Sequence, residues 1–163
     1  MDTYRTIITK RDTRQYSDRP IGEETLRRIL QAGRMAGSAK NVQPCRFVVI
    51  RSEAKKEALA RCGQFAKHMP GAPVVVAIVL PEGGREFDAG RAAQNMMLAA
   101  WAEGLTSCPT TMHDGDCARR ALGLPEGHRV SIALLFGYPP PAGIETLGAP
   151  RLPLEELVHE EEW

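Results

Sequence analysis

The residues best suited to chemistry lie in a short polar run, Gly37 to Pro44, which reads Gly-Ser-Ala-Lys-Asn-Val-Gln-Pro and precedes the apolar run 47–50. Its side chains at Ser38, Asn41 and Gln43 offer hydrogen-bond donors and acceptors without bulk or fixed charge, so they can face a flat ligand edged with heteroatoms. The same side chains could equally satisfy local backbone groups in a polar connector before a strand.

A basic cluster, Lys10 to Tyr16, forms the second candidate and reads Lys-Arg-Asp-Thr-Arg-Gln-Tyr. If this stretch ends a helix, Lys10, Arg11 and Arg14 stand at helical spacings and could converge on one anion. A solvated helix face is the ordinary explanation of such a cluster. Considered together, an anion site and a surface for a planar ring indicate a flavin nucleotide.

The length, composition and charge of the chain limit the kinds of partner that it can bind. The chain has 163 residues, a single-domain length, and a net charge of +1 with acidic and basic residues interleaved. The surface therefore has no broad positive electrostatic field that would bind nucleic acid or an anionic membrane. The longest apolar run, 74–80, is far shorter than the ~20 residues that span a bilayer, and charges occupy the N-terminus where a signal peptide would be apolar. We expect a cytoplasmic protein with neither nucleic-acid nor membrane partners.

The four cysteines are scattered at Cys45, Cys62, Cys108 and Cys117. In a chain long enough to build a core, this favours reduced thiols over a disulfide framework. Cys108, His113 and Cys117 faintly resemble half a metal site, but no fourth ligand is evident and the spacing matches none of the common zinc patterns. We expect no metal.

Helices and apolar strands alternate along the chain. Helical periodicity and acidic starts predict helices over 2–10, 23–35, 53–62, 88–103 and 114–122, with a short continuation at 64–69. Gly104 is a natural stop for the fourth of these helices. Apolar and β-branched runs predict strands over 47–51, 74–80 and 130–136, and 105–112 is expected to be a connecting segment. We find no internal repeat and no second domain.

The predicted helix 88–103 has almost no polar face, because most of its second half is apolar: Ala92, Ala93, Met96, Met97, Leu98, Ala99, Ala100 and Trp101. A helix that is apolar all round must be covered all round. A subunit interface would provide that cover. A central helix wrapped within one chain is the alternative.

Three blocks occur in an order that resembles the nitroreductase family of FMN-dependent oxidoreductases. They are Lys10-Arg11-x-x-Arg14-x-Tyr16, Ser38-x-x-Asn41-x-Gln43-Pro44 and Asp88-x-Gly90-x-Ala92-Ala93-Gln94-Asn95. The C-terminal part of the sequence is also similar to this family, with Gly137-Tyr138-Pro139 followed by Arg151-x-Pro153-Leu154-Glu155-Glu156-Leu157. The resemblance covers nearly the whole chain, and the block from Ser38 to Pro44 is its most specific part.

The resemblance implies an α+β fold: a three-layer α/β/α sandwich around a central mixed, mainly antiparallel sheet. It implies one FMN-binding domain over 1–163, with 137–163 as an extended C-terminal arm. It also implies an intertwined homodimer in which two FMN sites are built at the interface from both chains.

Roles in the cofactor site follow from the same resemblance. Lys10 or Arg11 would contact the FMN phosphate, and Arg14 the N1/O2 edge of the flavin, where a fixed guanidinium stabilises the reduced state more than the oxidised one. The polar run would reach the flavin across the interface, Arg151 would close on the phosphate, and a backbone N–H near Thr111 or Met112 would donate to N5. The expected cofactor-binding residues are Lys10, Arg11, Asp12, Arg14, Ser38, Ala39, Lys40, Asn41, Gln43, Thr111, Met112 and Arg151.

The implied activity is ping-pong hydride transfer from NAD(P)H through flavin N5 to a small conjugated acceptor such as a nitroaromatic or a quinone, with no obligatory protein acid or nucleophile. Two departures from the pattern of the family bear on this implied activity. The segment 105–112 lacks the Glu-Gly pair of many relatives, and Asp12 stands where many have Ser and could pair with Lys10 or Arg14. An acidic residue there also resembles dimethylbenzimidazole synthase, which fragments reduced flavin. A non-catalytic flavin-binding dimer is a further alternative.

Overall fold

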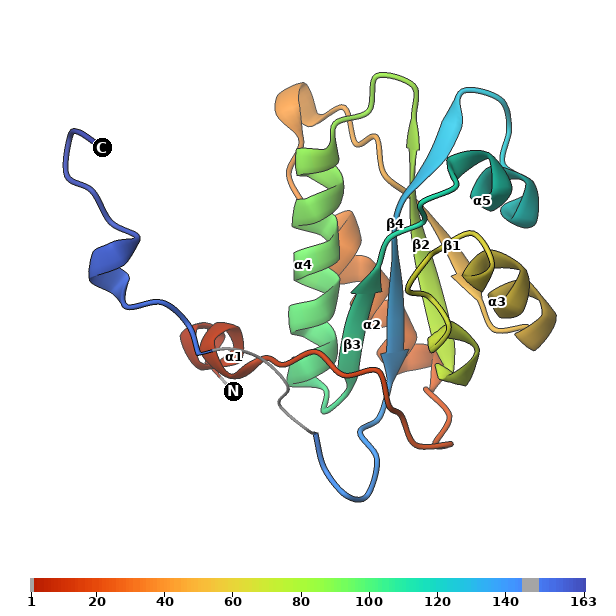
Figure 1. The fold of residues 1–163 in the computed structure, drawn as a ribbon, viewed down its shortest axis with the longest axis horizontal. Helices are drawn as coiled ribbons and strands as arrows, with labels where there is room; N and C mark the ends of the chain where they lie inside the picture. The colour runs from red at the N-terminus through yellow and green to blue at the C-terminus, as the bar shows by residue number, and fades with distance from the viewer. Residues whose placement is uncertain (1, 145–149) are drawn as a thin grey trace.

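The structure is a computed structural model that describes residues 2–144 and 150–163 (Figure 1). Helices and strands alternate through most of the chain. In chain order they are α1 (Thr3–Thr9), α2 (Glu23–Arg34), β1 (Arg46–Ile50), α3 (Glu53–Ala60), β2 (Val74–Pro81), α4 (Glu86–Ala102), β3 (Thr106–Thr110), α5 (Gly115–Leu122) and β4 (His128–Gly137). Short 3-10 turns occur at η1 (Ala39–Asn41), η2 (Met69–Gly71) and η3 (Leu154–Glu156).

The strands form one four-stranded sheet in the order β1-β2-β4-β3, and every strand pair in it is antiparallel. A parallel bridge joins Asp12 to Ser107 at the β3 edge. The central strand β2 is buried throughout 74–80, as its β-branched run predicts.

Alternate residues of β2 point to opposite faces of the sheet and into two separate cores. Val76 and Ile78 pack with α2 and α4, whereas Val75 and Ala77 pack with residues of α3 and α5. Figure 1 shows α2 and α4 on one face of the sheet and α3 and α5 on the other. The predicted α+β class and three-layer arrangement are confirmed.

The helix α4 is covered on one side within the chain. Met96 is fully buried, and the crossing with α2 is so close that a Cβ on Gly33 would clash with the Met96 side chain. Phe87 on the same helix is exposed. Part of this apolar helix is therefore wrapped by its own subunit, and the remainder stays open to solvent in one copy.

Two predicted segments differ from the structure. Residues 64–68 form turns rather than a helix, Met69 begins the 3-10 helix η2, and the segment 105–112 contains the edge strand β3. Pro109 and the polar neighbours of β3 conceal the strand pattern, but an edge strand tolerates proline because one side of it needs no ladder partner.

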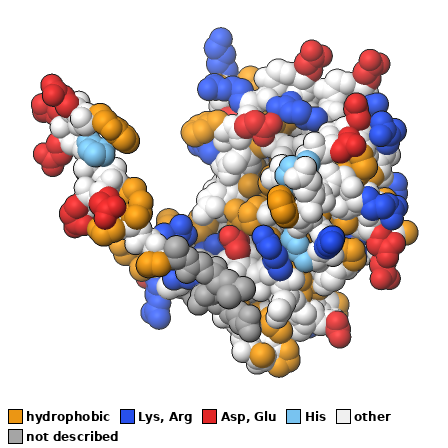
Figure 2. All heavy atoms as spheres, viewed as in Figure 1, with side chains coloured by type: hydrophobic (Ala, Val, Ile, Leu, Met, Phe, Trp, Pro, Cys, Tyr) orange, Lys and Arg blue, Asp and Glu red, His pale blue; other side chains and the backbone are white. Residues whose placement is uncertain are grey.

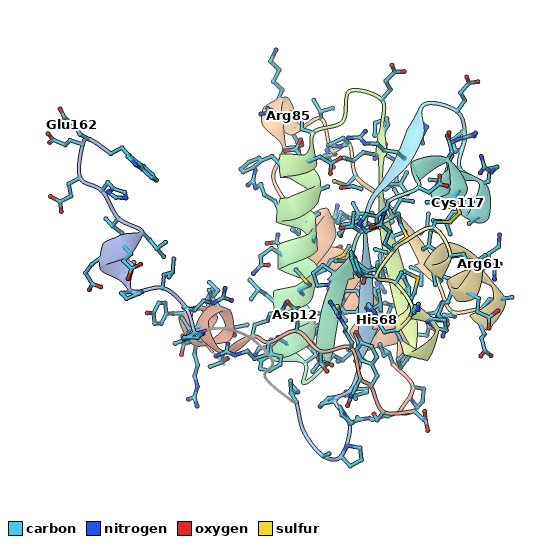
Figure 3. All side chains as sticks on the ribbon, in the orientation of Figure 1. Asp12, Arg61, His68, Arg85, Cys117 and Glu162 are labelled. Atoms are coloured by element: carbon cyan, nitrogen blue, oxygen red, sulfur yellow. A yellow bond between two sulfur atoms is a disulfide. The ribbon has the colours of Figure 1, made fainter. Side chains whose placement is uncertain are left out.

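The expectation of four reduced thiols is wrong for two of them. Cys62 and Cys117 form a disulfide with their Cα atoms 5.5 Å apart, whereas Cys45 and Cys108 are free. The disulfide joins the chain just after α3 to the first turns of α5, and Figure 3 labels Cys117. The two cysteines lie far apart in sequence, so only the packing of α3 beside α5 brings them together.

We expect the double substitution Cys62→Ser and Cys117→Ser to lower the free energy of unfolding by about 2–4 kcal/mol, because the link constrains a long loop of the unfolded chain. Urea unfolding of the unreduced proteins measures this change. Cys45→Ser is the control and should have a smaller effect. Four free thiols in the denatured, unreduced protein would contradict the prediction.

Candidate functional site

The basic N-terminal cluster lies along the outer edge of the sheet rather than on a helix. The helix α1 ends at Thr9, and Lys10 already has an extended backbone with ψ of 133°. The Thr13 N–H donates to the Ser107 carbonyl at 3.1 Å, and the Ser17 N–H donates to the Tyr138 carbonyl at 2.9 Å. The premise that this stretch ends a helix is therefore wrong, because the open edge of β3 offers backbone partners that draw the chain out straight.

Lys10 and Asp12 form an ion pair within this segment. Lys10 Nζ also lies 3.5 Å from Met97 Sδ on α4, and its side chain is only 10% exposed. Of the two partners expected for Asp12, Lys10 is the one found. The Lys10 ammonium therefore neutralises the Asp12 carboxylate, and Lys10 is not free to pair with another anion.

Arg11 and Arg14 differ from Lys10, since neither forms an ion pair within residues 2–144 and 150–163. Arg11 is exposed, and its guanidinium donates only to the carbonyls of Ile8 at 3.0 Å and Lys10 at 2.9 Å. Both guanidinium groups are thus available to an anion.

Arg14 meets a cluster of polar side chains on and beside β3. Burial raises the pKa of the Cys108 thiol, although hydrogen bonds from Arg14 and Thr110 act in the opposite direction. His68 Nε2 lies 3.3 Å from Thr110 Oγ1 and 3.7 Å from Cys108 Sγ. Figure 3 shows Asp12 and His68 flanking β3, and Figure 2 shows basic and histidine side chains gathered on this face.

Two further polar groups border this cluster. Tyr16 donates its hydroxyl to the Thr13 carbonyl at 2.9 Å, and burial raises the pKa of its phenol far above the usual range. Ser107 Oγ is buried and has no hydrogen-bond partner among the residues that the structure describes. A buried hydroxyl without a partner is unusual, because buried polar groups are almost always hydrogen-bonded.

Sequence reasoning missed His68, Cys108 and Thr110 as members of this cluster. His68 fell in a segment expected to be helical, and no spacing in the sequence connects it with β3. Only the turn that carries residues 64–68 across the sheet brings them together.

The segment that carries His68 is fastened at both ends. Near its start, the Gln64 N–H donates to His113 Nδ1 at 3.1 Å. Beyond its end, the buried Lys56 ammonium donates to the carbonyls of Pro70 at 2.9 Å and Ala72 at 2.7 Å. The segment therefore holds His68 on a rigid frame.

Thr111 and Met112 follow β3 directly and pack against the same segment. A Cβ on Gly63 would lie 2.9 Å from the Thr111 carbonyl and 3.2 Å from Met112 Cε. Thr111 is exposed and Met112 is buried. The backbone expected to meet flavin N5 thus lies at the end of the strand that bears Cys108 and Thr110.

The polar run is an exposed loop with an unusual backbone. Lys40, Asn41 and Gln43 all have positive φ, at 51°, 54° and 52°. Ser38 Oγ accepts a hydrogen bond from the Gln43 N–H at 2.8 Å, which closes the loop on itself. Such left-handed conformations are uncommon for residues other than glycine and cluster at functional sites. Ala39 is also exposed, so the loop presents its outer surface to solvent.

One subunit does not bring the polar run and the basic cluster together. Gly37 lies against Arg91 near the start of α4, whereas Lys10 meets Met97 further along and Thr9 Oγ1 accepts from Trp101 Nε1 at 3.1 Å. The rise from 91 to 97 alone is about 9 Å. Figure 1 shows the two regions near opposite ends of α4. Arg151 lies in the exposed segment 150–163.

Large apolar side chains are exposed on α1 and on the C-terminal segment. On α1 they are Tyr4, Ile7 and Ile8. On the C-terminal segment they are Leu152, Leu154, Leu157, Val158 and Trp163. In Figure 1 this segment runs outward from the neighbourhood of α1 and away from the sheet. Clustered exposed apolar groups of this kind mark a surface that another protein surface covers.

Two other kinds of site find no support in the described ranges. No helix in them is long and apolar enough to cross a bilayer. Within the same residues, no group of three or more His, Cys, Asp or Glu side chains could hold a metal ion.

Comparison with known proteins gives a consistent result. The model of the nitroreductase family matches residues 7–79 and 64–138. The chain is 30% identical to a protein named NADH dehydrogenase from Thermus thermophilus, covering 97% of this chain and 95% of that protein. It is 29% identical to the NADPH-flavin oxidoreductase of Vibrio harveyi, covering 99% and 75% respectively.

Among solved structures, one from Desulfovibrio desulfuricans, described as a nitroreductase in complex with FMN, is 32% identical. It superposes with a TM-score of 0.87 and covers 100% of this chain and 99% of that one. The family match spans most of the chain and agrees with the three-layer fold. The chain therefore belongs to the nitroreductase family.

Proposed function

We propose that this protein is an FMN-dependent oxidoreductase that takes hydride from NAD(P)H and delivers electrons to small conjugated acceptors such as nitroaromatics or quinones. The observation that carries the proposal is that the guanidinium groups of Arg11 and Arg14 have no ion-pair partner among the described residues, whereas neighbouring Lys10 is paired with Asp12. The similarity to a chain that was solved with FMN supports it.

The residues present fit FMN. Because Lys10 is paired with Asp12, Arg11 is the better candidate for the phosphate. Arg14 can serve the N1/O2 edge, and the backbone at Thr111 or Met112 can donate to N5. When bound, FMN supplies the hydride chemistry, while the protein supplies binding, orientation and electrostatics.

The polypeptide itself contributes positive charge at the β3 edge of the sheet, in place before the reaction begins. Arg14 presents a planar guanidinium close to Cys108 on β3. A fixed cation favours negative charge that develops next to it, and it needs no reorganisation at the moment of reaction. Lys10 neutralises Asp12, so the acidic residue does not oppose a bound phosphate.

Anaerobic titration of the purified, FMN-loaded protein with NADH and with NADPH tests the proposal. A yellow protein whose flavin absorbance bleaches supports the reductase. Colour without bleaching supports a non-catalytic flavin carrier, and failure to bind FMN contradicts the proposal. Detection of dimethylbenzimidazole after the reduced complex meets air would favour the flavin-fragmenting alternative instead.

We also propose that the working site needs two copies of the chain. The polar run and the basic cluster lie apart in one subunit, and apolar side chains are exposed on α1 and the C-terminal segment. A second copy would cover those side chains and bring its own polar run to the cluster. This arrangement agrees with the shared-site dimer that the family resemblance implies.

Sedimentation analysis should therefore give the mass of two chains. The double substitution Leu154→Asp and Leu157→Asp should shift the protein toward single chains and lower FMN retention, because it places charge on the exposed apolar surface. The matched control, Glu155→Gln with Glu156→Gln, changes the same turn and should leave the dimer intact. A single chain that retains FMN would contradict the dimer.

A further inference from the structure

The imidazole of His68 lies among groups proposed for the flavin site, yet no role has been given to it. Its Nε2 meets Thr110 and Cys108 on β3, and Thr110 directly precedes the proposed N5 donor Thr111. Arg14 is close enough to lower the pKa values of both Cys108 and His68. His68 thus shares its immediate surroundings with two proposed flavin contacts, and this inference rests on the proposed function.

The hydrogen bonds of His68 define how it can carry a proton. Nε2 faces β3, so Nδ1 is the ring nitrogen turned away from it, on the side of the Phe65 backbone that acts to raise the pKa of His68. In the neutral tautomer that carries its hydrogen on Nδ1, Nε2 accepts from the Thr110 hydroxyl. A second proton at Nε2 would reverse that bond, so that the imidazolium donates to Thr110 Oγ1.

The surroundings of His68 favour its neutral form as long as no additional negative charge lies nearby. Burial and the nearby Arg14 lower its pKa below the usual value, while the Phe65 hydrogen bond acts weakly in the opposite direction. The charged or titratable groups that face it are Arg14 from the N-terminal segment and Cys108 from β3. The Asp12 carboxylate, which also acts on Cys108, is paired with Lys10, so a further negative charge placed on this face would raise the pKa of His68.

We propose that His68 is the proton-holding residue of this face: it takes up a proton when two electrons arrive with the hydride, and gives it up when they leave. Hydride from NAD(P)H brings two electrons and one proton, so its arrival leaves one unit of negative charge on this face. A proton taken from water by Nε2 of His68 balances that charge. A quinone becomes a hydroquinone by gaining two electrons and two protons. One proton accompanies the departing hydride, and the other leaves Nε2.

Neighbouring groups are less suited to this role. The guanidinium of Arg14 has donors but no acceptor atom, and Lys10 is paired with Asp12. Burial raises the pKa values of Tyr16 and Cys108, so both stay protonated near neutral pH and cannot accept another proton. His68 is therefore the member of this cluster that can change its charge with the state of the flavin.

Proton uptake during anaerobic reduction tests the role directly. Dithionite-free reduction with NADH or NADPH is followed in weak buffer near pH 6.5 with an indicator dye. We expect wild type to take up as much as about one proton per flavin more than His68→Gln, which keeps a hydrogen-bonding amide but does not titrate. His128→Gln is the matched control, because His128 contacts the Glu126 carbonyl in a distant turn.

Proton NMR provides a second readout that does not depend on turnover. The titration midpoint of the His68 ring should rise on reduction, by about one pH unit for a tenfold coupling. Thr110→Val, which removes the hydroxyl at Nε2, should shift that midpoint even if His68→Gln binds FMN poorly. A midpoint that is the same in both flavin states, with normal FMN bleaching and equal proton uptake in His68→Gln, overturns this inference alone. Failure to bind FMN overturns the proposed function and this inference together.

Discussion

Arg14→Ala is expected to weaken FMN binding by about 10- to 100-fold, which corresponds to the loss of hydrogen bonds from a charged group, about 1.5–3 kcal/mol. Hydride acceptance should slow as well, because the cation favours the reduced state of the flavin. Quenching of FMN fluorescence measures the first effect, and stopped-flow reduction of the loaded protein measures the second.

Two controls separate this role from general charge effects. Arg120→Ala removes an exposed guanidinium on α5 and should leave both measurements unchanged. Arg14→Lys keeps the charge but not the planar fork, so it should recover only part of the binding. If Arg14→Ala binds and accepts hydride like wild type, Arg14 has no place in the site.

Phe136→Ala should lower the free energy of unfolding by about 3–5 kcal/mol, the usual cost of truncating a buried aromatic side chain. Phe136 lies on β4, is fully buried, and packs in the core between the sheet, α2 and α4. Urea unfolding at one fixed protein concentration measures the loss, since unfolding of a dimer depends on concentration.

Phe87→Ala is the matched comparison, because Phe87 is 67% exposed on α4. It should change the unfolding free energy by no more than about 0.5 kcal/mol. Equal losses for the two variants would show that the core between α2, α4 and the sheet is not where stability resides.

Local signals in the sequence were sufficient for most of the fold. In α2, Leu26 and Ile29 recur at helical spacing behind two glutamates, and both are buried. Asp114 caps α5 by accepting from the Cys117 N–H at 2.8 Å, and Gly104 follows α4 with positive φ. These features depend on near neighbours, which is why a single sequence reveals them.

Features that depend on distant partners were missed. The strand β3 exists because β4 and the N-terminal segment pair with it, and its own residues carry little strand pattern. The same pairing straightens residues 10–14, so the three cations do not share a helical face. His68 and the Cys62–Cys117 disulfide likewise depend on contacts between segments far apart in the chain.

Resemblance, rather than residue chemistry, supplied most of the proposed site. The polar run by itself was as compatible with a connector as with a ligand loop, and its three left-handed residues are visible only in the structure. The structure refines the assignment in one respect, because the engaged Lys10 leaves Arg11 as the freer cation for a phosphate. The roles of these residues toward FMN stay predictions.

The bond between Cys62 and Cys117 makes the intervening backbone a closed covalent ring that contains β2, α4 and β3. The exposed turn at Glu82 and Gly83 lies within that ring. A protease cut there would open the ring without separating the pieces, which would stay tied as one molecule until a reductant released them.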